Sequence, residues 1–376
     1  MSPIAPVNSS ALDAIVVFDG VEKTYDGVNI VVERLDLEIQ RGEFLTMLGP
    51  SGSGKTTSLM MLAGFEMPTA GRIILDGKPI ERLPPHLRNI GVVFQNYALF
   101  PHMTVAENVA FPLQMRGIGK AEQRSRVEKA LDMVQMNQFA GRRPAQLSGG
   151  QQQRIALARA LVFEPSLVLM DEPLGALDKR LRDQLQEEIS RLHRKLGITV
   201  IYVTHDQQEA MSMSDRIVLM NNGRIEQVAA PETLYRRPET EFAAEFLGES
   251  NFLPGVAAGD GGDPAIHLSS GETVAPPEGS PLSVGEAVKI MVRPEKLSLL
   301  FGEQDAAAGL NRASGTVVER IFLGGVTRHL VELADGTVVR SVTSGETRHG
   351  ALAPGDAVVV AWRPDDAIVF RTENAR

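Results

Sequence analysis

The sequence contains no cysteine among its 376 residues. This absence excludes disulfide bonds, zinc sites with thiolate ligands and catalytic cysteines. A reducing cytosol is compatible with the composition but is not required by it. Long apolar runs are also missing. No segment reaches the roughly 18 apolar residues of a membrane-spanning helix, so we expect any role at a membrane to come through a partner.

A basic charge balance is absent as well. The formal net charge is −9 and no basic stripe is found, so we expect no nucleic-acid partner. Residues 1–14 show no basic patch followed by an apolar core, which argues against a secretory signal. We expect a disordered lead-in there. The length exceeds what one hydrophobic core usually holds and predicts two domains.

Residues 15–248 have the pattern of an α/β domain. Short apolar or β-branched runs predict strands, several of them fully buried. These runs are residues 28–39, 44–48, 167–170 and 199–203. Strands that alternate with helices predict a largely parallel sheet covered on both faces, and we also expect an antiparallel β subdomain and a helical subdomain.

Helix and turn signals lie between these strands. A helix is expected from about Gly54 onwards. The spacing of Leu and Ile predicts a second helix over residues 179–196, and Gly197 stands where a helix usually ends. Asn-Asn-Gly at the centre of residues 216–228 predicts a β-hairpin.

Residues 249–376 have a different sequence pattern from residues 15–248, because short β-like runs are broken by Gly, Pro and Asp. Residues 283–300 (SVGEAVKIMVRPEKLSLL) resemble residues 353–370 (APGDAVVVAWRPDDAIVF) at a constant offset of seventy residues. Chance similarity between two strand–turn–strand units is the alternative. We favour a duplicated β element, which predicts a small barrel-like, all-β domain.

The segment GPSGSGKTT fits the phosphate-loop pattern G-x-x-x-x-G-K-[ST]. Glycines allow several backbone N–H groups to face one phosphate chain, and the following helix adds its positive N-terminal end. Lys55 would supply charge to the β- and γ-phosphates of ATP, and Thr56 would offer a hydroxyl to Mg²⁺. A glycine-rich turn that matches by accident is the alternative. The predicted nucleotide-binding residues are Gly49, Pro50, Ser51, Gly52, Ser53, Gly54, Lys55, Thr56 and Thr57.

The segment SLVLMDEP supplies carboxylates at the end of an apolar strand. Asp171 would lie at the sheet edge, where it can hold Mg²⁺, usually through water. Glu172 comes next and could polarise an attacking water. An exposed acidic turn is the alternative, and it is disfavoured once a phosphate loop is present.

The segment LSGGQQQR resembles the LSGGQ signature of the ABC ATPase family. With the motifs above, the resemblance covers residues from about 16 to 228. It implies that the signature opens a helix and binds the γ-phosphate of an ATP held by another copy of the chain. A second anion site on one chain is otherwise redundant, so we expect a homodimer. The matching residues are Ser148, Gly149, Gly150 and Gln151.

Further family motifs follow in order, and their roles are those that the resemblance implies. Tyr25, placed before the first expected strand, matches the ring that stacks on adenine. Gln95 matches the glutamine that reaches Mg²⁺ and the attacking water. Asp178 ends the Gly-Ala-Leu-Asp loop that crosses the dimer interface, and His205 matches the histidine at the γ-phosphate. The resemblance thus implies catalytic roles for Glu172, His205 and Gln95, and a metal site at Thr56, Gln95 and Asp171.

The sequence VRPE within the β-rich tail resembles the TOBE or OB-like accessory domain of ABC importer ATPases. Within that class the chain is most similar to the spermidine/putrescine type, while sugar, iron(III) and other organic solutes stay open. The resemblance implies two membrane-spanning permease subunits, an indirect solute-binding protein and a peripheral place on the cytoplasmic face of the membrane.

Two other classes compete with an importer. A non-transport ABC ATPase acting on nucleic acid is disfavoured by the negative charge and by the importer-like tail. A degenerate subunit that only binds ATP is disfavoured because Lys55, Asp171, Glu172 and His205 are all present.

Overall fold

The computed structural model describes residues 14–175, 177–259, 264–300, 309–344 and 352–372. The expected lead-in (except Ala14) and Ala176 of the Gly-Ala-Leu-Asp loop lie outside the described residues. The chain divides into two compact units, Met1–Arg236 and Arg237–Arg376. Across the described residues, every helix is too short or too polar to span a lipid bilayer.

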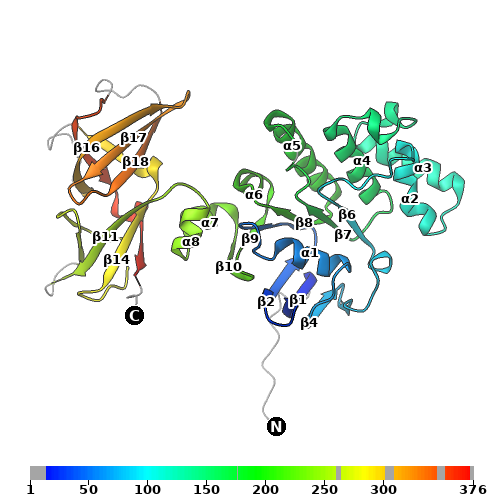
Figure 1. Ribbon diagram of the computed structural model, residues 1–376, viewed down its shortest axis with the longest axis horizontal. Coiled ribbons are helices and arrows are strands. Elements are labelled where there is room, and N and C mark those ends of the chain that lie inside the picture. Colours follow the sequence, from blue (N-terminus) through cyan, green and yellow to red (C-terminus); the bar gives the residue numbers. More distant parts are fainter. Residues whose placement is uncertain (1–13, 176, 260–263, 301–308, 345–351, 373–376) are drawn as a thin grey trace, which may run out of the picture. The chain divides into compact units, whose positions relative to one another are not determined.

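A six-stranded sheet forms the centre of the first unit (Figure 1). Its strand order is β10-β9-β3-β8-β7-β6. All neighbours pair in parallel except β10, which returns antiparallel to β9 through the predicted hairpin. The bounds are β3 (Phe44–Leu48), β6 (Ile90–Val93), β7 (Leu167–Asp171), β8 (Thr199–Thr204), β9 (Arg216–Asn221) and β10 (Arg224–Ala229).

Helices cover both faces of this sheet, as the alternating pattern predicts. Residues of β7 alternate between two cores: Leu167 and Leu169 face one side, and Val168 and Met170 face the other. The first core includes α1 (Lys55–Ala63), and the second includes α4 (Gly149–Leu161) and α5 (Lys179–Leu196). Buried strands therefore lack the polar alternation of a half-exposed sheet.

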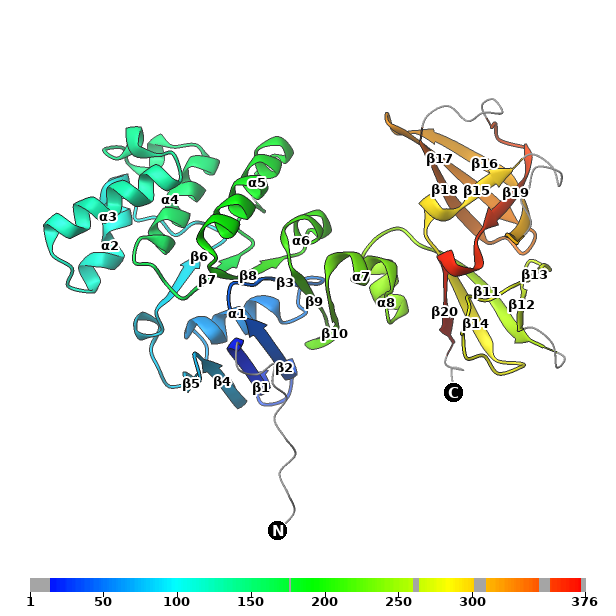
Figure 2. The ribbon, with the colours of Figure 1, turned by 180° about the vertical axis from the view of Figure 1, so that it is seen from behind.

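An antiparallel sheet lies on the other side of α1, so that α1 is held between two sheets (Figure 2). Its strands, in the order β2-β1-β4-β5, are β2 (Ile30–Gln40), β1 (Ala14–Thr24), β4 (Ala70–Leu75) and β5 (Lys78–Pro79). Sequence analysis did not predict β1. Its pairing with β2 shifts register between Phe18 and Val21 and at three further places, so its apolar alternation is broken.

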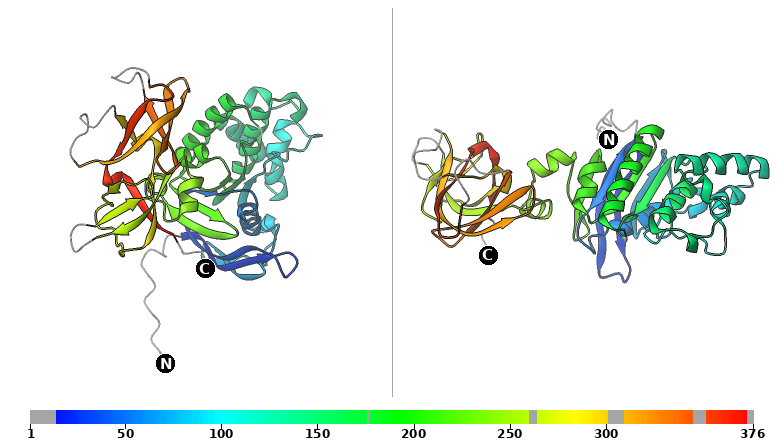
Figure 3. Two further views of the ribbon diagram at one scale, coloured as in Figure 1. Left: turned by 60° about the vertical axis from the view of Figure 1, so that its left-hand side comes forward. Right: turned by 90° about the horizontal axis from the view of Figure 1, so that it is seen from above.

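Two cyan helices form a separate core with α4 (Figures 1 and 3). They are α2 (Val105–Met115) and α3 (Lys120–Met133). Two shorter helices, α6 (Gln207–Met213) and α7 (Pro231–Arg236), complete the unit. Each predicted subdomain, antiparallel and helical, is thus present.

The second unit consists of α8 (Glu241–Phe246) and two five-stranded antiparallel sheets around one core. The sheet orders are β13-β12-β11-β14-β20 and β15-β19-β16-β17-β18. The bounds are β11 (Asn251–Ala258), β12 (Ala265–Leu268), β13 (Thr273–Val274), β14 (Ala287–Val292), β15 (Ser298–Leu300), β16 (Asn311–Phe322), β17 (Val326–Leu333), β18 (Val338–Ser344), β19 (Ala357–Trp362) and β20 (Ala367–Arg371).

The two similar segments, residues 283–300 and 353–370, have the same secondary structure. Each copy is a strand, a 3₁₀ turn and a second strand, and the 3₁₀ turns are Pro294–Lys296 and Pro364–Asp366. β14 of one copy pairs with β20 of the other, and β15 pairs with β19. Each copy therefore gives one strand to each sheet, which explains how a duplicated element closes around a single core.

The division between the units lies at Arg236/Arg237, earlier than the boundary expected after residue 248. Arg293, 5% exposed, explains the difference. Its Nη1 donates to the carbonyl oxygens of Ala244, Gly248 and Glu249 and to Ser250 Oγ. A buried guanidinium of the β-rich unit therefore holds α8 and the following turn, a long-range contact that local sequence does not reveal.

Candidate functional site

Three predicted motifs meet at one edge of the six-stranded sheet. Leu48 pairs with Thr204, and Asp171 pairs with Val203, so β3, β7 and β8 end at the same level. The segments that follow these strands carry the phosphate loop, Glu172 and His205. Ligands of open α/β sheets usually bind at the carboxyl ends of the strands. Strand register thus brings together motifs that lie far apart in the sequence.

The phosphate loop is shaped by close backbone contacts. A β-carbon on Gly49 would lie 2.2 Å from the carbonyl oxygen of Met220, and one on Gly54 would lie 2.8 Å from that of Val31. Gly54 also has a φ of 94° and precedes α1 without a side-chain cap. The first N–H groups of α1 are therefore not capped by the side chain at its start, as a phosphate site requires.

Lys55 is buried within this loop. Its Nζ donates to the carbonyl oxygens of Gly49 and Pro50, each at 2.9 Å, and to Ser53 Oγ at 3.3 Å. Burial lowers the pKa of Lys55, while the carboxylates of Glu172 and Asp171 raise it. The ammonium group is thus held among neutral oxygens, which a phosphate could replace.

Thr56 and Asp171 form one donor set. Thr56 Oγ1 donates to Asp171 Oδ1 at 2.9 Å. Burial raises the pKa of Asp171, and the hydrogen bond from Thr56 lowers it. Hydroxyl and carboxylate oxygens are ligands that Mg²⁺ accepts alongside phosphate and water. Thr56 and Asp171 therefore offer two oxygen donors of the kind that would fit a Mg²⁺ bound by nucleotide phosphates.

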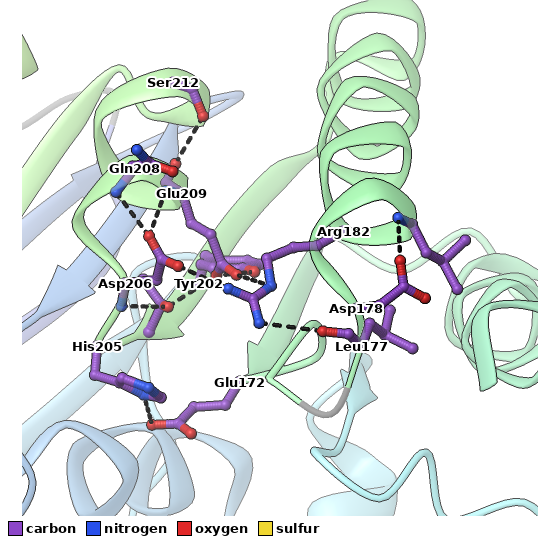
Figure 4. Close-up of polar contacts among 12 residues, drawn as sticks. Glu172, Leu177, Asp178, Arg182, Tyr202, His205, Asp206, Gln208, Glu209 and Ser212 are labelled. Atoms are coloured by element: carbon purple, nitrogen blue, oxygen red, sulfur yellow. Dashed lines mark hydrogen bonds and ion pairs between the residues drawn. The ribbon is translucent and has the colours of Figure 1, made fainter. Parts of the chain in front are cut away.

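Glu172 contacts both of the other predicted catalytic residues. Its Oε2 accepts a hydrogen bond from Gln95 Nε2 at 3.2 Å. Its Oε1 lies 3.1 Å from His205 Nδ1 (Figure 4). Its backbone has a φ of 41°, in the left-handed region that non-glycine residues rarely adopt. The N–H of Glu172 donates to the carbonyl of Val203, which holds this conformation next to β8.

Tyr25 follows β1 and precedes β2, so the expectation that it lies before the first strand was wrong. Its side chain is 60% exposed, and Lys23 Nζ lies 4.6 Å from the ring centroid. Sequence analysis did not single out Lys23, because this residue lies in β1, a strand that the sequence did not predict. An exposed ring with a cation beside it is available for stacking.

The signature residues form the start of α4. Ser148 Oγ accepts from the N–H of Gln151 at 3.4 Å, and the N–H of Ser148 donates to Gln151 Oε1 at 3.0 Å. This is a capping box. Gly149 and Gly150 face leucines: β-carbons there would lie 3.2 Å from Leu177 Cδ2 and 2.9 Å from Leu181 Cδ2. These glycines therefore also serve packing, which the motif alone does not reveal.

Asp178 caps α5. Its Oδ1 accepts from the N–H of Leu181 at 3.0 Å. In the part of the chain that the structure describes, no hydrogen bond joins Asp178 or a signature residue to the phosphate loop. Within the described residues of one chain, the predicted site thus falls into two groups, one at the sheet edge and one around the start of α4.

Comparisons with known proteins match both units. The family model described as ABC transporter matches residues 32–175, and that of the TOBE domain matches residues 290–370. The chain is 46% identical to the spermidine/putrescine import ATP-binding protein PotA of Thermobifida fusca over 372 residues, covering 98% of this chain and 96% of that protein. It is 43% identical to the putrescine transport ATP-binding protein PotG of Escherichia coli, covering 96% of each.

Solved structures resemble the first unit. A dimeric ATP-binding cassette in a post-hydrolysis state, bound to ADP and phosphate, is 35% identical, with a TM-score of 0.53 over 57% of this chain and 98% of that chain. The protein cbiO1 of Clostridium perfringens, part of the ABC transporter complex cbiONQ, is 30% identical, with a TM-score of 0.56 over 60% of this chain and 92% of that chain.

Proposed function

The chain belongs to the ABC transporter family of ATP-binding subunits, and from this premise we propose that it drives the import of polyamines, spermidine or putrescine. The observation that carries the proposal is the 46% identity to a spermidine/putrescine import protein over 98% of this chain, since it includes the β-rich unit as well as the ATPase unit. The ATPase site itself touches no solute, so the cargo is inferred from similarity over the whole chain.

The phosphate loop and Lys55 hold the β- and γ-phosphates of ATP, and Tyr25 stacks on the adenine. Thr56 and Asp171, with Gln95, hold Mg²⁺, which when bound neutralises phosphate charge. Hydrolysis is then a matter of position and charge. Glu172 accepts a proton from the attacking water, and His205 and Gln95 keep this carboxylate oriented through the contacts at 3.1 and 3.2 Å.

The signature residues complete the site of a second copy. Each ATP lies between the phosphate loop of one copy and residues 148–151 of the other, with Asp178 at the interface. One observation supports this arrangement: a similar ATP-binding cassette is dimeric in two of its solved structures. Loss of the γ-phosphate removes the link and lets the dimer open.

The partners follow from this role. Opening and closing of the dimer moves two membrane-spanning permease subunits, and a solute-binding protein outside the membrane delivers the polyamine to them. The chain then works as a peripheral subunit on the cytoplasmic face of the membrane. It requires ATP and Mg²⁺ and no nucleic acid.

The test is uptake of radiolabelled spermidine and putrescine by cells that lack the gene, complemented with the parent chain or with Glu172→Gln. We expect the parent to restore uptake and the variant not to. Uptake of a sugar or of iron(III), without polyamine uptake, would assign the ATPase to another importer. Unchanged uptake of every solute would contradict a transport role.

A further inference from the structure

We propose that Arg182 is a positioning residue that joins the loop carrying Asp178 to the loop carrying His205, and so couples the two ATP sites of the dimer. The proposal rests on the proposed function, because it uses the roles of those two loops. Arg182 lies on the first turn of α5, away from the phosphate loop, and no motif identified it.

The guanidinium group bridges two loops directly (Figure 4). Arg182 Nη2 donates to the carbonyl oxygen of Leu177 at 3.2 Å, and Nη1 donates to Asp206 Oδ2 at 3.0 Å. Leu177 precedes Asp178, and Asp206 follows His205. One planar guanidinium group therefore links the two loops.

The first loop is also in contact with the signature. Leu177 and Leu181 are the leucines that Gly149 and Gly150 approach at the start of α4. Any shift of the signature helix against α5 must therefore move Leu177, since close-packed groups cannot absorb it. In the proposed dimer, the signature segment and the loop with Leu177 and Asp178 both lie at the ATP that the other copy binds.

The second loop is held firmly at its own end. Asp206 Oδ1 accepts the N–H groups of Gln208 and Glu209 at the start of α6, at 2.8 and 3.3 Å. The N–H of Asp206 donates to Thr204 Oγ1 at 3.0 Å. A movement of Arg182 would therefore shift Asp206 and the adjoining backbone of His205. The Nδ1 atom of His205 lies 3.1 Å from Glu172 Oε1.

A buried carboxylate lies beneath the link. Glu209, 2% exposed, accepts hydrogen bonds from Tyr202 Oη at 2.7 Å and from Thr204 Oγ1 at 2.8 Å. Its Oε1 lies 3.8 Å from Arg182 Nε, and this buried Nε has no hydrogen-bond partner among the described residues. The cation thus has two charge partners, Asp206 at the N-cap of α6 and Glu209 within α6, that keep it in place.

The consequence is a path between the two composite sites. When the dimer closes around the ATP of the other copy, the signature segment and Leu177 would become fixed in position. Through its contacts with Leu177 and Asp206, Arg182 would then fix the position of His205 at the chain's own ATP. Lysine can supply the charge of Arg182, but its donors all sit on one nitrogen, so it cannot reach both loops as Nη1 and Nη2 of the guanidinium do.

The test compares Arg182→Lys and Arg182→Met with Arg194→Met, an exposed arginine on the same helix, in the full-length chain. We would measure the kcat of ATP hydrolysis, the Hill coefficient for ATP and the melting temperature. Arg182→Lys is expected to lower kcat about tenfold, since small misplacements of catalytic groups cost up to about 100-fold. Its Hill coefficient should fall towards one, while its melting temperature stays that of Arg194→Met.

A second comparison identifies the path. Asp206→Asn keeps the cap of α6 but removes the charge that Arg182 contacts. The double variant Arg182→Lys/Asp206→Asn should lose no more activity than the stronger single variant, because both changes break one link.

Three results would overturn the proposal: parent-like kcat and Hill coefficient in Arg182→Lys, additive losses in the double variant, or a loss of kcat that follows a loss of melting temperature. Failure of the proposed function gives a different result. If the parent chain and Glu172→Gln both hydrolysed ATP, another residue would be the catalytic base. The kcat and Hill coefficient of the Arg182 variants could still be compared with those of the parent.

Discussion

Two helix starts in the ATPase unit are predicted to bind phosphate, and they are built in opposite ways. α1 begins after Gly54 with no side-chain cap, and the buried Lys55 stands beside it. α4 begins with Ser148 in a capping box, and its segment from Ser148 to Gln151 has no ionisable group. The free N–H groups at the start of α1 can bind the phosphates of the ATP that the same chain holds. At the start of α4, the side chain of Ser148 already accepts a hydrogen bond from one of these N–H groups. A complete site therefore needs both kinds, one to hold ATP and one to sense its γ-phosphate when a second copy approaches.

The largest effect should come from the carboxylate of Glu172, which follows β7 and interacts with the charge of Lys55 at the start of α1. Glu172→Gln keeps the shape of the site but removes the proton acceptor, so kcat for ATP hydrolysis should fall about 1,000-fold, within the range of general base catalysis. ATP binding should persist, and the variant should accumulate as an ATP-bound dimer in light scattering. Hydrolysis at the parent rate would show that another group is the base.

Lys55→Met tests the binding half of the same start. Loss of the ammonium should weaken ATP binding by roughly 100-fold, the scale of charged hydrogen bonds. Equilibrium titration with fluorescent ATP measures it. Lys129→Met on the exposed side of α3 is the control and should bind ATP like the parent. Equal affinities of the two variants would contradict the assignment of the phosphate loop.

Ser148→Ala tests the other helix start. It removes the cap of α4, which should lower the free energy of unfolding by about 1 kcal/mol. The ATP-dependent dimer should weaken, while ATP affinity of the monomer is unchanged. Thr104→Ala removes the same kind of capping box from α2, so it should cost similar stability without affecting the dimer. If both variants dimerise equally, Ser148 acts only as a cap.

The smallest effect is a pH dependence that only the α1 start should show. Burial lowers the pKa of Lys55 in the folded chain below its ordinary value of 10.5. Above this lowered pKa the folded state binds fewer protons than the unfolded state, so the stability that the parent has relative to Lys55→Met should rise as pH increases towards 10.5. Urea unfolding at pH 7.5, 8.5 and 9.5 measures the difference. Saturating ATP should flatten it, because phosphate favours the charged lysine. A difference that is constant or falls with pH would contradict the burial of a charged group.

Much of the first unit could be predicted because its signals are local. The strand over residues 44–48 and the helix over residues 179–196 have the bounds that the patterns indicate, and Gly197 ends that helix with a φ of 62°. β1 was missed because bulges interrupt its alternation, which also misplaced Tyr25. The domain boundary after residue 248 stays a prediction. The compact units divide earlier, at Arg236/Arg237, and the contacts of Arg293 with residues 244–250 join segments more than forty residues apart.

The sequence by itself determined the family, the phosphate loop and the helix that begins at the signature, because each is a contiguous motif whose chemistry its own residues supply. Only the tertiary structure decided that Gln95 and His205 both contact Glu172, since that depends on the register of β7 and β8. It also decided that Gly149 and Gly150 lie against Leu177 and Leu181, and that Arg182 bridges two loops. Such contacts depend on how helices pack on a sheet, and no local pattern of residues encodes them.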